Sequence, residues 1–143
     1  MGSRGRVLVV DDERAIRALV AKIVERMGHP VDTACDGADA IAKLEVERYD
    51  VIVLDLMMPN IDGYGLIAHL KQRGGPRPAI IVVSAGESVA LRQLDPAMVH
   101  SIIRKPFDID VLGDLISAAA QAAELEQKAH HDVLPFRRND HAC

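Results

Sequence analysis

Acidic side chains follow two apolar runs in the first half of the chain. Asp11 and Asp12 come after Val7–Val10, and Asp55 comes after Val51–Leu54. Where two such runs form parallel strands of one sheet, their carboxyl ends open onto the same edge, and three carboxylates meet there. Two carboxylates about 4 Å apart repel by about 1 kcal/mol in water and about 4 kcal/mol at an effective dielectric constant of 20. The cluster therefore requires raised pKa values or a cation, and Mg²⁺, which prefers carboxylate and phosphate oxygens, fits best.

A hydroxyl and an ammonium group follow two later apolar runs. Ser84 comes after Ala79–Val83, and Lys105 comes shortly after Ile102–Ile103. Lysine supplies positive charge for phosphate oxygens and serine supplies a hydroxyl donor, so the five groups together predict a site for a metal ion and an anion. Each group alone has a simpler explanation. Asp12 could cap the helix that follows it, and a single Ser or Lys at a strand end is usually solvated.

The apolar runs themselves predict strands. They are short, rich in β-branched residues and without alternation, which is typical of strands buried on both faces. These runs are Val7–Val10, Val51–Leu54, Ala79–Val83 and Ile102–Ile103. A weaker fifth candidate, Val31–Ala34, follows Gly28-His29-Pro30, where glycine and proline should end the preceding helix.

Apolar residues at three- and four-residue steps predict helices between these strands. The patterns cover residues 13–27, 38–46, 66–70, 89–94 and 109–119. About five alternations of strand and helix predict an α/β fold, a doubly wound five-stranded parallel sheet with helices on both faces. Ligands of such sheets bind at the carboxyl ends of the strands, where the acids, the hydroxyl and the amine lie.

As an ordered set, the segments that carry these groups resemble the receiver domain of bacterial response regulators. The matching segments are Val7–Glu13, Leu54–Gly63, Val83–Ala85 and Lys105–Phe107, and the resemblance extends over about residues 6–123. It implies a flavodoxin-like fold with strand order 2-1-3-4-5. It also implies a phosphoaspartate switch in a two-component phosphorelay, which takes its phosphoryl group from a histidine kinase or histidine phosphotransferase and acts on a downstream protein of unspecified identity.

The resemblance assigns a role to each residue of the set. It implies that Asp55 is the phosphoacceptor and that Asp11, Asp12, Asp55 and the backbone carbonyl of Met57 hold Mg²⁺. Ser84 matches the switch hydroxyl, and Lys105 matches the lysine that contacts the phosphoryl group.

Two further features of the family are local. The resemblance implies a cis peptide bond before Pro106. Asp62 should cap the helix that begins near Gly63.

The chain departs from the family pattern at the expected switch. The family usually has Tyr or Phe three residues before the lysine, and Ile102 stands here. Isoleucine cannot swing a ring or hydroxyl, so either the output differs or backbone movement after Ser84 carries the coupling.

Two other departures lie outside the switch. Pro96 should shorten the fourth helix. Met57 and Gly86 occupy positions that modulate the lifetime of the phosphoryl group in this family.

Composition limits the classes of protein. The chain has 143 residues, enough for one domain, with 49% hydrophobic and 27% charged residues and a net charge of -4, which argues against a basic nucleic-acid-binding surface. Cys35 and Cys143 lie too far apart in the sequence for a disulfide framework or a Cys-x-x-Cys metal site. No apolar run approaches the roughly 20 residues of a bilayer span, and Met1 to Arg6 lack the apolar core expected of a signal peptide. We expect a cytoplasmic location and no membrane partner.

The ends of the chain are expected to differ from the domain. Residues 1–5 should be disordered, residues 6–123 form the receiver domain, and residues 124–143 form a helical extension and a disordered tail. Approximate heptad spacing allows a weak homodimer through this helix. The spacing involves Leu112, Leu115, Ala119, Ala122 and Glu126.

Two other functions share part of the pattern. A pseudo-receiver would bind protein partners without phosphorylation, against which the complete set of acids and Lys105 argues. An Mg²⁺-dependent aspartyl phosphohydrolase generally has a second acid two residues after its nucleophile, and Met57 stands there instead. We therefore expect a protein that is not an enzyme in the usual sense, because it catalyses only its own phosphoryl transfer and dephosphorylation.

Overall fold

The computed structural model describes residues 5–58, 60–85 and 91–133, with side chains to residue 125. Its centre is one sheet of five parallel strands in the order β2-β1-β3-β4-β5. The strands are β1 (Val7–Val10), β2 (Val31–Ala34), β3 (Val51–Asp55), β4 (Ala79–Ser84) and β5 (Ser101–Arg104). The predicted fold class and strand order are both confirmed.

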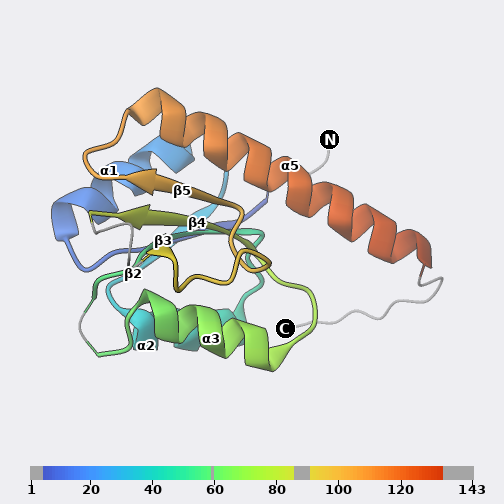
Figure 1. Ribbon diagram of the computed structural model, residues 1–143. Coiled ribbons are helices and arrows are strands. Elements are labelled where there is room, and N and C mark those ends of the chain that lie inside the picture. Colours follow the sequence, from blue (N-terminus) through green and yellow to red (C-terminus); the bar gives the residue numbers. More distant parts are fainter. Residues whose placement is uncertain (1–4, 59, 86–90, 134–143) are drawn as a thin grey trace.

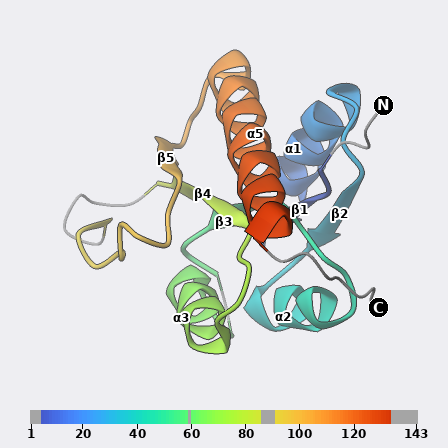
Figure 2. The same ribbon diagram turned by 90° about the vertical axis from the view of Figure 1, so that its right-hand side faces the viewer.

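Helices cover both faces of this sheet (Figures 1 and 2). One face carries α1 (Arg14–Arg26) and α5 (Ile109–Val133), and the other carries α2 (Gly37–Val46) and α3 (Gly63–Arg73). Of the expected disordered residues 1–5, residues 1–4 lie outside the described residues, as do residues 134–143 of the expected helical extension and tail at residues 124–143. The helix expected over residues 89–94 also lies partly outside them. The described residues after it form turns, with Met98 N–H donating to the Asp95 carbonyl, next to Pro96.

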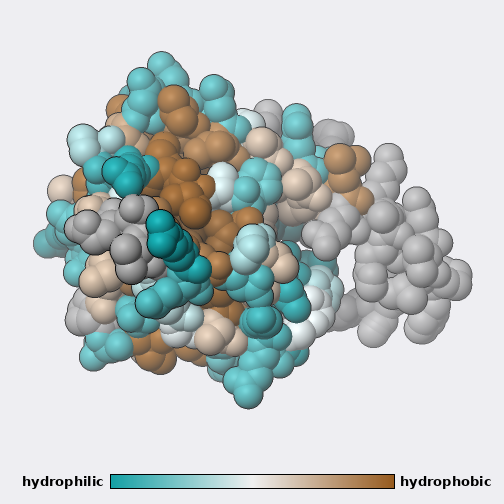
Figure 3. Space-filling view, viewed as in Figure 1, coloured by the Kyte–Doolittle hydropathy of each residue, from teal (hydrophilic) through white to brown (hydrophobic). Residues whose placement is uncertain are grey.

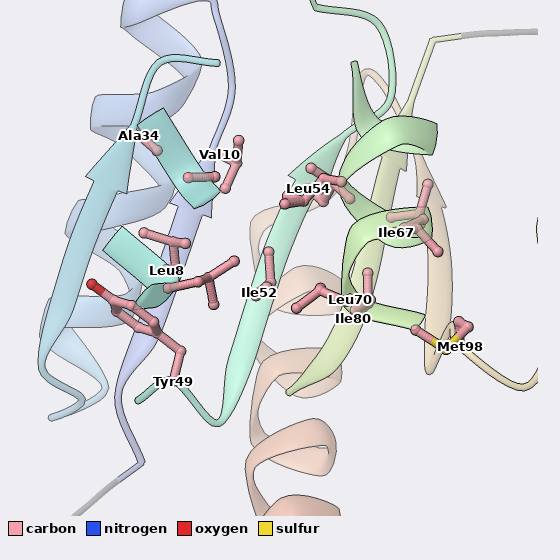
Figure 4. Close-up of a cluster of buried hydrophobic side chains, with 14 of the residues drawn as sticks. Leu8, Val10, Ala34, Tyr49, Ile52, Leu54, Ile67, Leu70, Ile80 and Met98 are labelled. Atoms are coloured by element: carbon pink, nitrogen blue, oxygen red, sulfur yellow. The ribbon is translucent and has the colours of Figure 1, made fainter. Parts of the chain in front are cut away.

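Side chains of the central strands alternate between two cores. Leu8, Ile52 and Ile80 lie opposite one another in the register and pack toward α2 and α3, as Figure 4 shows. Their neighbours Val7, Val51 and Ile81 belong to the second core, beneath α1 and α5. Each fully buried aliphatic side chain contributes about 1.5–3 kcal/mol, and a slip of one residue would turn every side chain to the other face. The two cores thus fix the register that aligns the carboxyl ends of the strands.

One expectation about the strands is wrong. Ile102–Ile103 was expected to be buried on both faces, but Ile102 is 44% exposed. The reason is the position of β5 at the edge of the sheet, where Ile103 joins the core beneath α5 and Ile102 lies on the opposite face, beside Val82. Figure 3 shows a hydrophobic band across this side of the molecule.

Local signals set the ends of the helices. Asp62 caps α3 by accepting a hydrogen bond from Gly65 N–H at 3.0 Å, as expected, and Asp36 caps α2 in the same way through Asp39 N–H. Gly28, at φ 91°, follows the end of α1. The alternative role of Asp12 as the cap of α1 is wrong, because α1 begins one residue later, after Glu13, and makes no side-chain cap hydrogen bond there.

Within the described part of the chain, no helix combines the length and the apolar character needed to cross a bilayer.

Candidate functional site

Three carboxylates meet at the carboxyl edge of the sheet. Val10 of β1 lies opposite Leu54 of β3, so the residues that follow them bring Asp11 and Asp55 together. With Asp12, they offer three carboxylate oxygens that all lie within 4.8 Å of one another. Asp11 and Asp55 are buried and Asp12 is exposed, so one side of the cluster faces solvent. The predicted meeting of the two strand ends is confirmed.

Lys105 reaches this cluster from the loop after β5. The peptide bond between Lys105 and Pro106 is cis, as expected, and Lys105 N–H donates to the Ser84 carbonyl at 2.9 Å. The ammonium nitrogen lies 3.3 Å from Asp11 Oδ2 and 3.6 Å from Asp55 Oδ2. Burial tends to lower the pKa of Lys105, but the hydrogen bond that its ammonium donates to Glu13 and the charges of Asp11 and Asp55 outweigh burial and raise this pKa. The lysine is therefore held as a cation beside the carboxylates.

Asp55 has the most strongly perturbed carboxyl group of the site. Burial, and next the charge of Asp11, raise its pKa from an ordinary 3.8 to about 7, although Lys105 and the backbone N–H of Met57 act in the opposite direction. Without a bound cation, Asp55 and Asp11 cannot both carry a full charge at low cost. A cation bound between the two carboxylates would relieve this repulsion.

Ser84 completes the set from the fourth strand. It is the last residue of β4 and is 1% exposed. Val83, the residue before it, lies opposite Asp55, so the hydroxyl belongs to the same end of the sheet as the acid. The five side chains predicted to meet thus come from the ends of β1, β3, β4 and β5.

The loop after Asp55 packs tightly against the start of α3. Met57 N–H donates to Asp55 Oδ1 at 3.2 Å, while the Met57 side chain is 64% exposed. Gly63 N–H donates to the Leu56 carbonyl, and a Cβ atom on Gly63 would lie 2.7 Å from Leu56 Cα. Gly63 therefore permits the close approach that holds the loop. Gly86, the other expected modulator of lifetime, lies outside the described residues.

Ile102 lies apart from these groups. It occupies the edge strand beside Val82, two residues before Ser84 along β4. The residue at the family's switch position is thus an exposed aliphatic side chain.

Two residues of the site were missed in the sequence. Glu13 Oε1 accepts a hydrogen bond from Lys105 Nζ at 3.0 Å, and its own N–H donates to Asp11 Oδ1 at 2.8 Å. Arg17, one turn into α1, donates to the Asp11 carbonyl at 2.8 Å. The sequence feature that could have identified Glu13 is its position directly after the acid pair, where it is a third acid. Arg17 has no comparable signal, because its partner is a backbone oxygen.

The donor set defines the chemistry that the site can support. Its candidate ligands are carboxylate oxygens, which suit a hard divalent cation. A buried carboxylate, a cation site and an ammonium group in contact are the parts that transfer of a phosphoryl group requires, since its main demands are alignment and cancellation of charge.

Most of the chain matches one known family of domains. The model of the family described as "Response regulator receiver domain" matches residues 7–117. The chain belongs to this family. Its segments Val7–Glu13, Leu54–Gly63, Val83–Ala85 and Lys105–Phe107 lie within the matched residues, so the family resemblance noted from them is confirmed.

Curated relatives of this receiver domain are regulators from mycobacteria. The transcriptional regulatory protein TcrA of Mycobacterium tuberculosis is 36% identical over 108 residues, which make up 75% of this chain and 42% of TcrA. The response regulator MprA of Mycobacterium ulcerans is 34% identical over 137 residues, 94% of this chain and 58% of MprA. The chain thus spans about half the length of these relatives.

Solved structures share the fold. A CheY-like receiver domain protein from Methanospirillum hungatei has a TM-score of 0.76 at 28% identity, covering 87% of this chain and 99% of that one. The chemotaxis response regulator CheY4 of Vibrio cholerae has a TM-score of 0.73 at 28% identity, covering 82% and 99%. The protein is a receiver domain of two-component response regulators, and neither the phosphohydrolase nor the pseudo-receiver alternative is favoured.

Proposed function

We propose that this receiver domain is switched by phosphorylation of Asp55. The observation that carries the proposal is the position of the Asp55 carboxylate, which lies in the three-acid cluster and 3.6 Å from the Lys105 ammonium. A nucleophilic carboxylate placed between a cation site and a lysine can take up a phosphoryl group, because both neighbours compensate the negative charge of the transferred oxygens.

The cation that best fits the cluster is Mg²⁺. Asp11, Asp12, Asp55 and the backbone carbonyl of Met57 would hold it. The three carboxylates support this choice, and the role of Met57 rests on the family resemblance. When bound, Mg²⁺ neutralises charge on the phosphoryl oxygens and relieves the repulsion between Asp11 and Asp55.

The proposed reaction uses the residues of the chain in distinct ways. One oxygen of Asp55 attacks the phosphorus of a phosphohistidine; an O–P bond forms as the N–P bond breaks, and the histidine nitrogen keeps the electron pair. Lys105 contacts the transferred group, and Ser84 donates its hydroxyl to it. The domain therefore catalyses only its own phosphorylation and dephosphorylation, and it is not an enzyme that turns over a separate substrate.

Receiver domains of response regulators interact with histidine kinases. We propose a histidine kinase or histidine phosphotransferase as the donor here and a downstream protein as the target. The exposed hydrophobic residues of β5 and early α5 favour a protein as the target. They are Ile102, Ile109 and Val111. The weak homodimer through α5 stays a prediction, which light scattering over a concentration series would test.

Intact-mass measurement tests the proposal. With Mg²⁺ and a small acyl phosphate or a phosphorylated kinase, the native chain should gain one phosphoryl group, whereas Asp55→Asn and the native chain without Mg²⁺ should gain none. A matched control is Asp114→Asn, an exposed acid of α5. Equal labelling of the native and Asp55→Asn chains would refute the assignment.

A further inference from the structure

The carboxylate closest to the Lys105 ammonium is neither Asp55 nor a member of the acid pair. Lys105 Nζ lies 3.0 Å from Glu13 Oε1, compared with 3.3 Å to Asp11 and 3.6 Å to Asp55. Glu13 and Lys105 are 92 positions apart in the sequence. Lys105, which the proposed reaction requires, is thus shared among three acids. The shortest of the three contacts is with Glu13, which has no assigned role.

The Glu13 side chain has no evident local function. Glu13 occupies the N-cap position of α1, but its side chain makes no cap hydrogen bond. It is 62% exposed, and within the described residues its one ion pair is with Lys105. The backbone of Glu13 is fixed to the site, since its N–H donates to Asp11 Oδ1 at 2.8 Å. The contact with Lys105 therefore follows from the position of the residue.

We propose that Glu13 is a positioning residue that holds Lys105 back from Asp55 in the unphosphorylated domain and so slows phosphoryl transfer. This inference rests on the proposed function. An ammonium group has three hydrogens, and three carboxylates occupy its surroundings here. To contact a phosphoryl group on Asp55, Lys105 must weaken its pair with Glu13, because the same ammonium serves both.

The size of the effect follows from the exposure of Glu13. Pairs that involve an exposed side chain are commonly worth about 0.2–1 kcal/mol, so loss of this pair should speed phosphorylation by about 1.4- to 5-fold. Two other effects of Glu13 must be separated from the effect of its ion pair with Lys105. A negative charge next to the site repels an anionic phosphoryl donor, and a carboxylate at the start of α1 stabilises the helix.

Two substitutions separate these effects. Glu13→Gln removes the charge and the ion pair. Glu13→Asp keeps the charge at the helix start but is one methylene shorter, which withdraws the carboxylate from Lys105 Nζ. Glu25→Gln, an exposed acid on the same helix, controls for net charge. Since Glu13 is exposed, all three variants should fold, and thermal unfolding of each chain checks this.

The experiment measures the phosphorylation rate constant with a small acyl phosphate at saturating Mg²⁺, by intact mass. Both Glu13 variants should be about 1.4- to 5-fold faster than the native chain, and Glu25→Gln should match it. The ¹⁵N resonance of the Lys105 ammonium should shift in both Glu13 variants without any phosphoryl donor.

Three outcomes would overturn the inference: a Glu13→Gln rate at or below that of the native chain, a native rate in Glu13→Asp, or an unchanged Lys105 resonance. The second outcome would assign the effect to charge repulsion of the donor. Absence of labelling in the native chain would instead overturn the proposed function, so the two failures are distinguishable.

Discussion

At the scale of single residues, the carboxyl group of Asp55 combines burial with a neighbouring negative charge. Its pKa is raised to about 7 in the folded domain, compared with an ordinary 3.8. A folded-state pKa above the unfolded value means that the folded protein binds more protons between these two pH values. The contribution of Asp55 to stability therefore falls as pH rises from about 4 to about 7, and the full penalty is present above pH 7.

The loss of stability on ionisation of Asp55 gives a prediction for Asp55→Asn. Asparagine has no charge to bury, so in the absence of Mg²⁺ the variant should be more stable than the native chain at pH 8, by on the order of 1–3 kcal/mol. The difference should shrink toward zero near pH 4, where Asp55 is itself protonated. Urea unfolding, monitored by circular dichroism at several pH values, measures the stability difference at pH 8 and its decrease toward pH 4. A variant that is less stable at pH 8, or a difference independent of pH, would contradict the assigned electrostatics.

At the scale of elements, the loop between β3 and α3 depends on a glycine. A Cβ atom at Gly63 would lie 2.7 Å from Leu56 Cα and 2.9 Å from the Asp55 carbonyl oxygen. Because both neighbours are backbone atoms, Gly63→Ala should shift the loop and destabilise the domain by roughly 1–3 kcal/mol. It should also slow phosphorylation, since the same backbone carries Asp55. Thermal unfolding and the intact-mass assay measure the two effects.

A second helical glycine provides the control. Gly113 lies within α5, and the nearest atom to an added Cβ would be Met27 Sδ at 4.0 Å. Gly113→Ala should therefore stabilise the domain by about 0.5–1 kcal/mol through helix propensity, without a change in phosphorylation. Equal effects of the two substitutions would show that the close contact at Gly63 is unimportant.

The edge strand β5 gives a prediction about output. Ile102 is 44% exposed and points away from the core beneath α5, so it does not support the phosphorylation site. Ile102→Tyr should leave the phosphorylation rate nearly unchanged and alter the affinity for the downstream protein, because it changes an exposed apolar surface. Rates come from intact mass, and affinities from binding with and without a beryllofluoride mimic. A large loss of phosphorylation would contradict this separation.

The sequence predicted the elements whose signals are local. Uninterrupted β-branched runs such as Val51–Leu54 identify buried strands, and acids directly after them identify the site. Sequence analysis did not predict features that depend on which elements lie side by side in the fold. The exposure of Ile102 follows from the edge position of β5, and the pair between Glu13 and Lys105 joins residues 92 positions apart. Neither can be read from spacing along the chain.

At the scale of the whole molecule, α5 extends past the two-core body. Its first part contributes Leu112, Ile116 and Ala119, all fully buried, to the core between the sheet and helices α1 and α5. Beyond Ala123, which is 7% exposed, Leu125 is 68% exposed. The helix continues to Val133. Ala123 is the last residue of α5 described as buried, so stability should depend on where the chain is cut.

A chain that ends at Ala123 should therefore keep its fold and its phosphorylation rate, with a loss of stability below about 1 kcal/mol, because the next residues, Glu124 and Leu125, are exposed. A chain that ends at Leu115 loses Ile116 and Ala119 from the core and should lose several kcal/mol, on the order of 2–5 for the isoleucine alone. Urea unfolding of both chains measures the difference. Strong destabilisation by the first cut would show that residues 124–133 pack against the domain, and tolerance of the second would contradict the assigned core.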